Sequence, residues 1–548
     1  EEVTLKNVND FKLIGTDVKN VDGKKIVTGQ PLFGLDFQRE GMKLAMIQHP
    51  PAFGMKLVDF NVDEIKNMPG VSDAFAIDTT IAEPGMFDEM GFKQLIAIVG
   101  ESTWQLMQAK KALKANWETT SELESSEMHI QSLEKVLVSG GEIEETRTDG
   151  NPEAAFKKAA KVIERTYSAP FIAHNTLEPM NFFANVTATD AELIGPTQTP
   201  EALEGSVAKL LNLPLENITV NMTRMGGGFG RRLYVHFGLE AAAISKKIGG
   251  PVKLIYSRED DMSQGTYRPT YRSVYKAGLD ENNNLIAFSV KGAGLTGGPV
   301  FVNRFPAGTV DNYFAQQIKA DSNITTGAWR APRSNFTAGA EQSFLDEVAE
   351  LAGKDPINFR LELFDRAIKN PVGEKNDYEA ERYAGVLKLV KEKANWGETK
   401  EGVHRGVAAY FCHSTYVAEI FDIVMKNGKP VIDKVWCAAD CGIVVNRDGA
   451  KNMLEGGIID GIGHGMYSQL TFENGAPQQM NFDTYQLIRN SQAPKEIEVF
   501  FVDNDIDPTG LGEPGLPPAI GALANALYKA TGQRHYHQPF NTEKQIVG

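Results

Sequence analysis

A glycine- and proline-rich turn near the end of the 548-residue chain decides how the rest of the sequence is interpreted. Residues 509–518 read Thr509-Gly510-Leu511-Gly512-Glu513-Pro514-Gly515-Leu516-Pro517-Pro518. The prolines stiffen this turn and suit a helix start, and the apolar run 519–530 predicts that helix. One carboxylate, Glu513, is therefore held on a rigid turn, which makes it a candidate general base. The alternative is a charged loop residue favoured by the nearby helix N-terminus.

A second glycine-rich stretch lies in the middle of the chain. It reads Met225-Gly226-Gly227-Gly228-Phe229-Gly230-Arg231-Arg232, between a strand-like run at 218–222 and a helix-like run at 234–247. A strand, a loop with free N–H groups and a helix start predict an anion-binding site, to which two arginines would add bidentate phosphate capture. The stretch matches neither the dinucleotide fingerprint nor a P-loop, which argues against a nicotinamide dehydrogenase. A tight turn is the alternative.

Four more stretches stand in a fixed order along the chain. They are Pro-Thr-Gln-Thr-Pro at 196–200, Gly-Ala-Trp-Arg-Ala-Pro at 327–332, Asp-Cys-Gly-Ile-Val-Val-Asn at 440–446 and Glu-Gly-Gly-Ile at 455–458. With the two glycine-rich turns they cover nearly the whole chain. In this order they resemble the molybdenum hydroxylases, the xanthine oxidase and aldehyde oxidase family, and within it the large (beta) subunit of isoquinoline 1-oxidoreductase.

This resemblance implies an α+β fold, with an α/β hammerhead domain followed by a two-lobed molybdopterin-binding region. We expect the hammerhead domain at 1–125, the first lobe at 126–400 and the second at 401–548. Apolar patterning within the first part predicts strands at 44–47, 71–77 and 95–99 and helices at 63–68 and 103–115. A polar, acidic, Ser-rich stretch at 118–127 suits a linker.

The resemblance also assigns roles to single residues. It makes Glu513 the general base, places Gln198 beside the molybdenum, and gives Arg268 the stabilisation of negative charge on the substrate. For each of these the alternative is an ordinary charged or polar residue on a loop or on the surface. The expected cofactor-binding residues are Gly227, Gly228, Phe229, Gly230, Arg231, Arg330, Asn446, Gly512, Asn525 and Thr531.

The implied cofactor is molybdopterin cytosine dinucleotide, whose dithiolene rather than any side chain holds the molybdenum. The only cysteines, Cys412, Cys437 and Cys441, read as buried structural residues. A pair of [2Fe–2S] clusters needs about eight thiolates, so we expect the clusters on a small iron–sulfur partner subunit. Relatives carry an N-terminal Glu-Met-Gly-Gln-Gly stretch, often behind a twin-arginine signal. We expect a further chain or segment to supply it, and a periplasmic location, with the cytoplasm as the alternative.

Overall charge and hydropathy narrow the range of possible binding partners and locations. The formal net charge of −15 argues against a nucleic-acid partner, and no apolar run approaches the length of a membrane span. The family resemblance implies an enzyme that hydroxylates an N-heteroaromatic, isoquinoline-like substrate or an aldehyde with water-derived oxygen. A cofactor-free scaffold or assembly paralogue of that subunit is the alternative, and a molybdenum assay separates the two.

Overall fold

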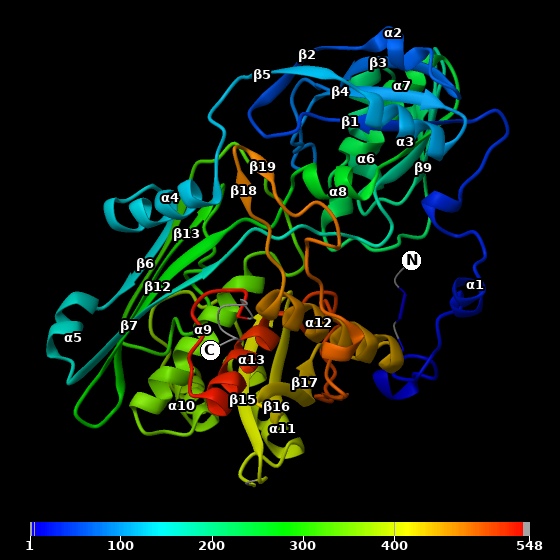
Figure 1. The fold of residues 1–548 in the computed structure, drawn as a ribbon. Coiled ribbons are helices and arrows are strands. Elements are labelled where there is room, and N and C mark those ends of the chain that lie inside the picture. Colours follow the sequence, from blue (N-terminus) through cyan, green and yellow to red (C-terminus); the bar gives the residue numbers. More distant parts are fainter. Residues whose placement is uncertain (1–2, 5, 399, 541–548) are drawn as a thin grey trace.

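A computed structural model describes residues 3–4, 6–398 and 400–540 and shows three sheets with their covering helices (Figure 1). A seven-stranded sheet forms the upper region, a five-stranded sheet the left flank, and a four-stranded sheet the lower region. Within the described residues, no helix is long and apolar enough to cross a membrane.

The seven-stranded sheet joins segments that lie far apart in the sequence. Its order is β10-β9-β8-β11-β1-β4-β3, and β1 runs parallel to β11 with Lys43 opposite Val252. The sheet therefore continues across the expected division at 125/126, and the three domain ranges stay a prediction. The predicted strands at 44–47, 71–77 and 95–99 are present in it. Its strands are β1 (Lys43–Gln48), β3 (Val71–Asp78), β4 (Gln94–Gly100), β8 (Asn181–Val186), β9 (Ala191–Gly195), β10 (Ile218–Met222) and β11 (Val252–Ile255).

Helices pack against this sheet where the apolar periodicity predicts them. Leu106 and Ala109 of α3 are fully buried against β1 and β4. The predicted helix at 103–115 ends at Ala112, because Ala115 already begins β5, which pairs with β2. These elements are α2 (Val62–Lys66), α3 (Thr103–Ala112), α6 (Pro200–Leu211), α7 (His236–Ile248), α8 (Arg258–Ser263), β2 (Met55–Phe60) and β5 (Ala115–Thr119).

The five-stranded sheet has α9 on one face and the short helix α5 on the other. Alternation along β12 separates the two faces: Tyr275 packs on Phe344 of α9, whereas the Lys276 ammonium lies over the Phe156 ring of α5. The order is β6-β14-β13-β12-β7. The elements are α4 (Ser126–Ser139), α5 (Pro152–Lys158), α9 (Ser334–Leu351), β6 (Glu142–Asp149), β7 (Lys161–Ala169), β12 (Tyr271–Leu279), β13 (Leu285–Leu295) and β14 (Asn312–Ala320).

The four-stranded sheet carries the two helices that place the Glu513 turn. The predicted helix at 519–530 is α13, which packs across β15 and β16 and beside α12. Small residues bring α12 and the turn together, since a Cβ on Gly461 would lie 2.6 Å from the Leu516 carbonyl oxygen. The elements are α10 (Pro356–Lys369), α11 (Ala380–Lys393), α12 (Arg447–Met466), α13 (Pro517–Thr531), β15 (Val403–Cys412), β16 (Thr415–Lys426), β17 (Lys429–Asp440) and β20 (Glu496–Phe501).

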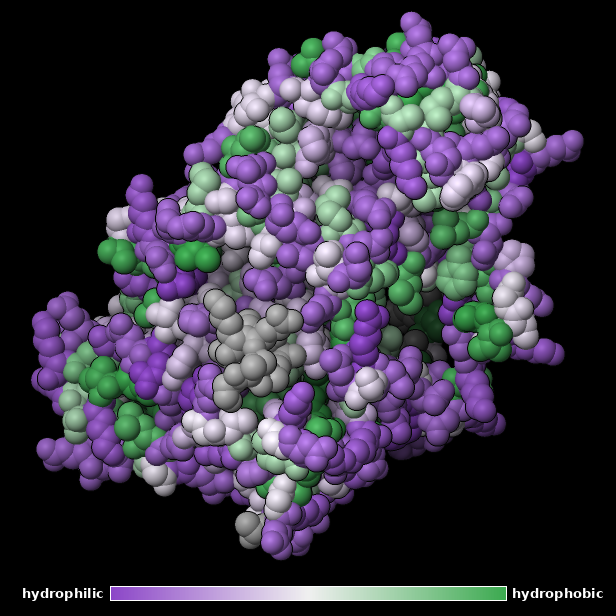
Figure 2. All heavy atoms as spheres, in the orientation of Figure 1, coloured by the Kyte–Doolittle hydropathy of each residue, from purple (hydrophilic) through white to green (hydrophobic). Residues whose placement is uncertain are grey.

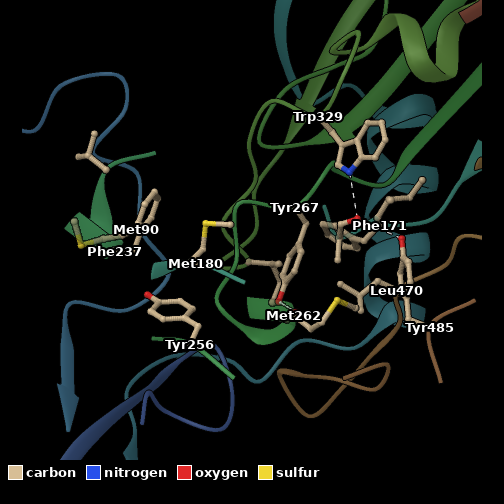
Figure 3. Packing of buried hydrophobic residues seen from close by; sticks show 14 of the residues in the cluster. Met90, Phe171, Met180, Phe237, Tyr256, Met262, Tyr267, Trp329, Leu470 and Tyr485 are labelled. Atoms are coloured by element: carbon tan, nitrogen blue, oxygen red, sulfur yellow. Dashed lines mark hydrogen bonds between the residues drawn. The ribbon is translucent and has the colours of Figure 1, made fainter. Parts of the chain in front are cut away.

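The upper and lower regions share a core. One buried apolar cluster runs from the seven-stranded sheet through Phe171, Tyr267, Trp329 and Tyr485 to α13, and Figure 3 shows its central part. An N-terminal arm, residues 13–32, also ties the regions together along the outside. Its Thr16 pairs with Asn446 of the lower region. The face beside this arm is hollowed (Figure 2), and all three cysteines are buried and free, as predicted.

Candidate active site

A hollow of about 700 Å³ lies where the glycine-rich loop, the 327–332 segment, α12 and the Glu513 turn meet. Segments from both predicted lobes therefore contribute to one site. Residues predicted from the sequence line much of it, and they come from four separate stretches of the chain. The predicted residues in its lining are Gln198, Phe229, Gly230, Arg330, Gly512 and Glu513.

The glycine-rich loop makes close contacts that side chains would block. Gly227 and Gly230 have φ values of +108° and +103°, which L-residues rarely adopt. A Cβ on Gly228 would lie 2.8 Å from Gln198 Oε1, and one on Gly230 would lie 2.0 Å from the Ala328 carbonyl oxygen. The loop backbone therefore lies bare against Gln198 on one side and the 327–332 segment on the other.

Two aromatic rings form a wall of the hollow. Phe229 has a left-handed φ of +57°, and its ring stacks on the Trp329 indole with centroids 5.8 Å apart and an interplanar angle of 9°. The indole N–H donates to the Ala173 carbonyl at 3.2 Å, and Trp329 is only 5% exposed (Figure 3). A flat ring bound in the hollow would meet a fixed aromatic surface.

The prediction that Arg231 and Arg232 capture phosphate is wrong, because both side chains point into the protein. Arg232 donates from Nε to the Gly227 carbonyl at 2.7 Å and pairs with Glu178 at 3.3 Å. Arg231 contacts His236 Nε2 at 2.9 Å and lies 3.6 Å from Asp261. Burial lowers the pKa of Arg232 to about 10. The arginines thus brace the loop from behind.

The local secondary structure also differs from the expected strand–loop–helix unit. A 3₁₀ turn at Arg231–Leu233 follows the loop, and α7 begins only at His236. The N–H groups of the loop are therefore separate from the start of a long helix, and the anion site cannot draw on the α7 dipole.

Glu178 is a site-supporting residue that the sequence analysis missed. Its Oε2 accepts from Gly226 N at 2.7 Å, and its Oε1 accepts from Leu35 N at 3.1 Å and from Asn181 Nδ2 at 3.0 Å. The side chain is nearly buried. The available signal was an acidic residue just before an apolar strand, Asn181–Val186, where an unpaired charge would be costly.

Arg330 holds the Glu513 turn in place. Its Nε donates to the Gly512 carbonyl at 2.6 Å, its Nη1 donates to Asp460 Oδ2 at 2.6 Å, and its Nη2 donates to the Met453 carbonyl at 3.1 Å. Within the described part of the chain, no group donates a hydrogen bond to the Glu513 carboxylate. The carboxylate is thus available to a bound ligand, while its backbone is fixed.

Arg268 lies outside the hollow, contrary to its predicted catalytic position. Its side chain is fully buried, donates to the Pro170 carbonyl, and leaves Nε and Nη1 without a partner. Burial lowers its pKa to about 10. Its guanidinium carbon lies 6.0 Å from the centre of the Tyr271 ring. The structure therefore does not support a direct role on the substrate.

Asn446 lies at an adjoining hollow, whereas Asn525 and Thr531 line neither. Asn446 caps α12 through Gly449 N at 3.1 Å and lines a second hollow of about 690 Å³, which shares Asn452 and Glu455 with the first. Asn525 is buried and donates to the Val407 carbonyl at 3.0 Å. Thr531 ends α13, about 20 Å from its start at a 1.5 Å rise per residue. The cofactor-binding roles of Asn525 and Thr531 therefore stay predictions.

No cluster of three or more His, Cys, Asp or Glu side chains suited to a metal ion occurs among residues 3–4, 6–398 and 400–540.

Comparisons with known proteins identify the family. Residues 138–364 and 345–494 match two families that are both described as "Molybdopterin cofactor-binding domain". The chain is 28% identical over 590 residues to "Membrane-bound aldehyde dehydrogenase [pyrroloquinoline-quinone]" of Gluconacetobacter polyoxogenes, covering all of this chain and 74% of that protein. It is 25% identical over 569 residues to "Isoquinoline 1-oxidoreductase subunit beta" of Brevundimonas diminuta, covering 97% and 68%.

Solved structures share the fold. Quinoline 2-oxidoreductase from Pseudomonas putida 86 superposes with a TM-score of 0.81 at 13% identity, covering 98% of each chain. The aldehyde oxidoreductase from Desulfovibrio desulfuricans superposes with a TM-score of 0.81 at 14% identity, covering 98% of this chain and 81% of that one. The predicted fold class and the predicted family are thereby confirmed. The chain belongs to the molybdenum hydroxylases, as a large molybdopterin-binding subunit.

Proposed function

We propose that this subunit oxidises an aldehyde or hydroxylates an N-heteroaromatic ring with water-derived oxygen, and that Glu513 is the general base. The observation that carries the proposal is the single hollow in which Glu513, Gln198 and the bare glycine-rich loop meet. The names of two relatives, an aldehyde dehydrogenase and an isoquinoline oxidoreductase, support the substrate classes.

The residues of the hollow fit a molybdopterin cofactor. Loop backbone without side chains at Gly228 and Gly230 leaves N–H groups free to approach a polar ring or phosphate closely. Gly512 adds open space, since nothing lies within 4 Å of a Cβ built there. The pterin would be held by Gln198 and the loop, and the adjoining hollow at Asn446 offers room for a cytosine dinucleotide tail.

When bound, the cofactor supplies the two-electron oxidation and the transfer of water-derived oxygen to the substrate carbon. Glu513 then accepts a proton at a carboxylate oxygen, while Arg330 keeps the turn from moving through the Gly512 carbonyl. The Phe229–Trp329 wall excludes water and orients a flat substrate. Glu513 therefore acts as the base, and the aromatic wall and Arg330 set the geometry.

We propose that a small subunit with [2Fe–2S] clusters carries the electrons away. All three cysteines of this chain are buried, and burial raises the pKa of Cys412 to about 12 and of Cys441 to about 11, which disfavours the thiolates a cluster needs. The relatives named as subunits of larger enzymes fit this arrangement. Purification of an active enzyme that reduces a cluster-dependent acceptor without a second polypeptide would contradict it.

Glu513→Gln tests the base directly. Gln has nearly the same volume but cannot accept the proton, so turnover should fall at least about 10²-fold while molybdenum content stays unchanged. Glu281→Gln on an exposed turn is the matched control and should keep full activity. Near-normal turnover in a metal-replete Glu513→Gln enzyme would exclude the role. A wild-type protein purified from its native host without molybdenum would favour the scaffold alternative.

A further inference from the structure

The hairpin turn between β15 and β16 projects a histidine into the substrate hollow. His413 and Ser414 form this two-residue turn, since Cys412 pairs directly with Thr415. His413 is exposed and lines the same hollow as Glu513, Arg330 and the aromatic wall. The sequence analysis did not single it out, and the proposed mechanism gives it no role.

The backbone of this turn is held in an uncommon conformation. Both central residues have left-handed φ values, +50° at His413 and +60° at Ser414, where hairpins of this type favour Asn and Gly. Such conformations are unfavourable for L-residues and persist where the surroundings fix them. Here Thr415 Oγ1 donates to the Gly510 carbonyl at 2.7 Å, which fastens the turn to the Glu513 loop.

His413 therefore lies close to the loop that carries the base. A Cβ built on Gly510 would lie 3.1 Å from His413 Cβ, so only glycine permits this approach without a shift. The turn and the Glu513 loop are therefore held together by this close backbone approach and by the Thr415 hydrogen bond.

The neighbouring thiol contacts one of the two ring nitrogens. Cys412 Sγ lies 3.0 Å from His413 Nδ1. Burial raises the pKa of the Cys412 thiol to about 12, so the sulfur keeps a hydrogen that it can donate. The tautomer that accepts this hydrogen at Nδ1 carries its own hydrogen on Nε2. Among the described residues no acceptor contacts Nε2, so His413 offers a free N–H donor to the hollow.

Arg330 and Glu513 do not duplicate this donor, whereas the side-chain amides of Gln198 and Asn452 in the same lining can also donate. All three guanidinium nitrogens of Arg330 donate to protein oxygens, and the Glu513 carboxylate is an acceptor when ionised. The Gln198 amide oxygen lies against Gly228. His413 thus complements Glu513, one side chain donating and the other accepting beside the same ligand.

We propose that His413 orients the substrate by donating its Nε2–H to an acceptor atom next to the reacting carbon, such as a ring nitrogen. This inference rests on the proposed function. It names the favoured substrate class: aromatic compounds with a nitrogen acceptor adjacent to the carbon, or to the aldehyde group, that is oxidised. His413 is a substrate-binding residue, distinct in role from the base.

The test compares two probes that differ by one ring nitrogen, pyridine-2-carbaldehyde and benzaldehyde. The holoenzyme is assayed as wild type, His413→Phe and His413→Gln, with molybdenum content measured for each. His413→Phe should lower the ratio of kcat/KM for the two probes about tenfold, the value of one lost hydrogen bond. The amide N–H of Gln should restore the ratio to within about threefold. Ser414→Ala in the same turn is the control and should leave it unchanged.

Binding supplies a readout that does not depend on turnover. Calorimetric titration of the same enzymes with pyridine-2-carboxylate and benzoate should show the same loss of preference in His413→Phe. Unchanged ratios of both kcat/KM and Kd in a metal-replete His413→Phe enzyme would overturn the inference. A wild type that binds the pyridine compound through His413 yet oxidises neither aldehyde would refute the proposed function and support the binding role.

Discussion

Arg330 donates from Nε to the carbonyl oxygen of Gly512 at 2.6 Å, so a residue of the first predicted lobe fixes the backbone directly before the candidate base in the second. The same guanidinium pairs with Asp460 of α12 at 2.6 Å. The backbone N–H of Arg330 also donates to the Phe229 carbonyl of the glycine-rich loop at 2.9 Å. The relative position of Glu513 and this loop thus depends on one residue, whose backbone contacts the loop and whose planar side chain contacts the turn.

Arg330→Lys should impair turnover more than folding. Lysine can keep the contact with Asp460 but cannot also reach the Gly512 and Met453 carbonyls in one plane. A displacement of about 1 Å at the Glu513 turn would lower kcat about 10²-fold. Steady-state kinetics checks this, with Arg366→Lys at the exposed pair with Asp311 as a control that should stay near wild type. Equal kcat in Arg330→Lys and wild type would show that the turn is fixed without the guanidinium.

Gly228→Val should remove the cofactor and spare the fold. The new side chain would meet Gln198 Oε1 at 2.8 Å and fill the space that a pterin would need. Molybdenum per polypeptide should drop to a few per cent of wild type, while the far-ultraviolet circular dichroism spectrum stays the same. Gly205→Ala in α6, where nothing lies within 4 Å of the added Cβ, is the control. Full molybdenum occupancy in Gly228→Val would show that the loop is only a structural turn.

Local sequence signals predicted elements well but not which faces their side chains occupy. The prolines and apolar run at 517–530 predicted α13 because they act within one helix. Arg231 and Arg232 could not be oriented, because their partners lie far away in the sequence: Glu178, which pairs with Arg232, lies some fifty positions earlier, and Asp261 lies near Arg231 only in the folded chain. The same limit applies to Asn525. Its position along α13 was predictable, but the hydrogen bond from its side chain to β15 was not.

The pairing of strands that lie far apart in the chain also could not be predicted from the sequence. Strands at 43–48 and 252–255 are adjacent in one sheet, and no local pattern encodes that choice. Of the candidate site, the residues on the two glycine-rich turns were predictable because glycine and proline mark close backbone approach. For Arg268, the position along the chain did not reveal that the side chain is fully buried.

His174 should make the fold sensitive to mild acid. Its Nε2–H donates to the Ala328 carbonyl at 2.8 Å, and burial lowers its pKa to about 3. The unfolded chain therefore binds a proton below about pH 6.5 that the folded chain excludes, and stability is lost as the pH falls from there. At pH 5 this amounts to about 2 kcal/mol.

His174→Gln keeps a donor for the Ala328 carbonyl but cannot take up the proton. Between pH 7 and pH 5, the free energy of unfolding from urea titrations should fall about 2 kcal/mol less in this variant than in wild type. His404→Gln, at the partly exposed start of β15, is the control and should follow wild type. Parallel pH dependences of wild type and His174→Gln would show that the buried imidazole does not contribute.

Ser414→Gly should stabilise the protein, because the turn that presents His413 is strained at this position. Ser414 has a φ of +60°, where an L-residue costs about 1–2 kcal/mol and glycine does not. The greater freedom of glycine in the unfolded chain offsets about 0.4–1 kcal/mol of that gain. Urea unfolding should therefore show a net gain of about 0.5–1 kcal/mol.

Ser491→Gly, in the exposed 3₁₀ turn Asn490–Gln492 without a positive φ, should lose stability by a similar amount. If Ser414→Gly also lost stability, the surroundings rather than the residue type would set the conformation of this turn. The gain expected here would show that strain is retained at the tip where the hairpin meets the Glu513 loop.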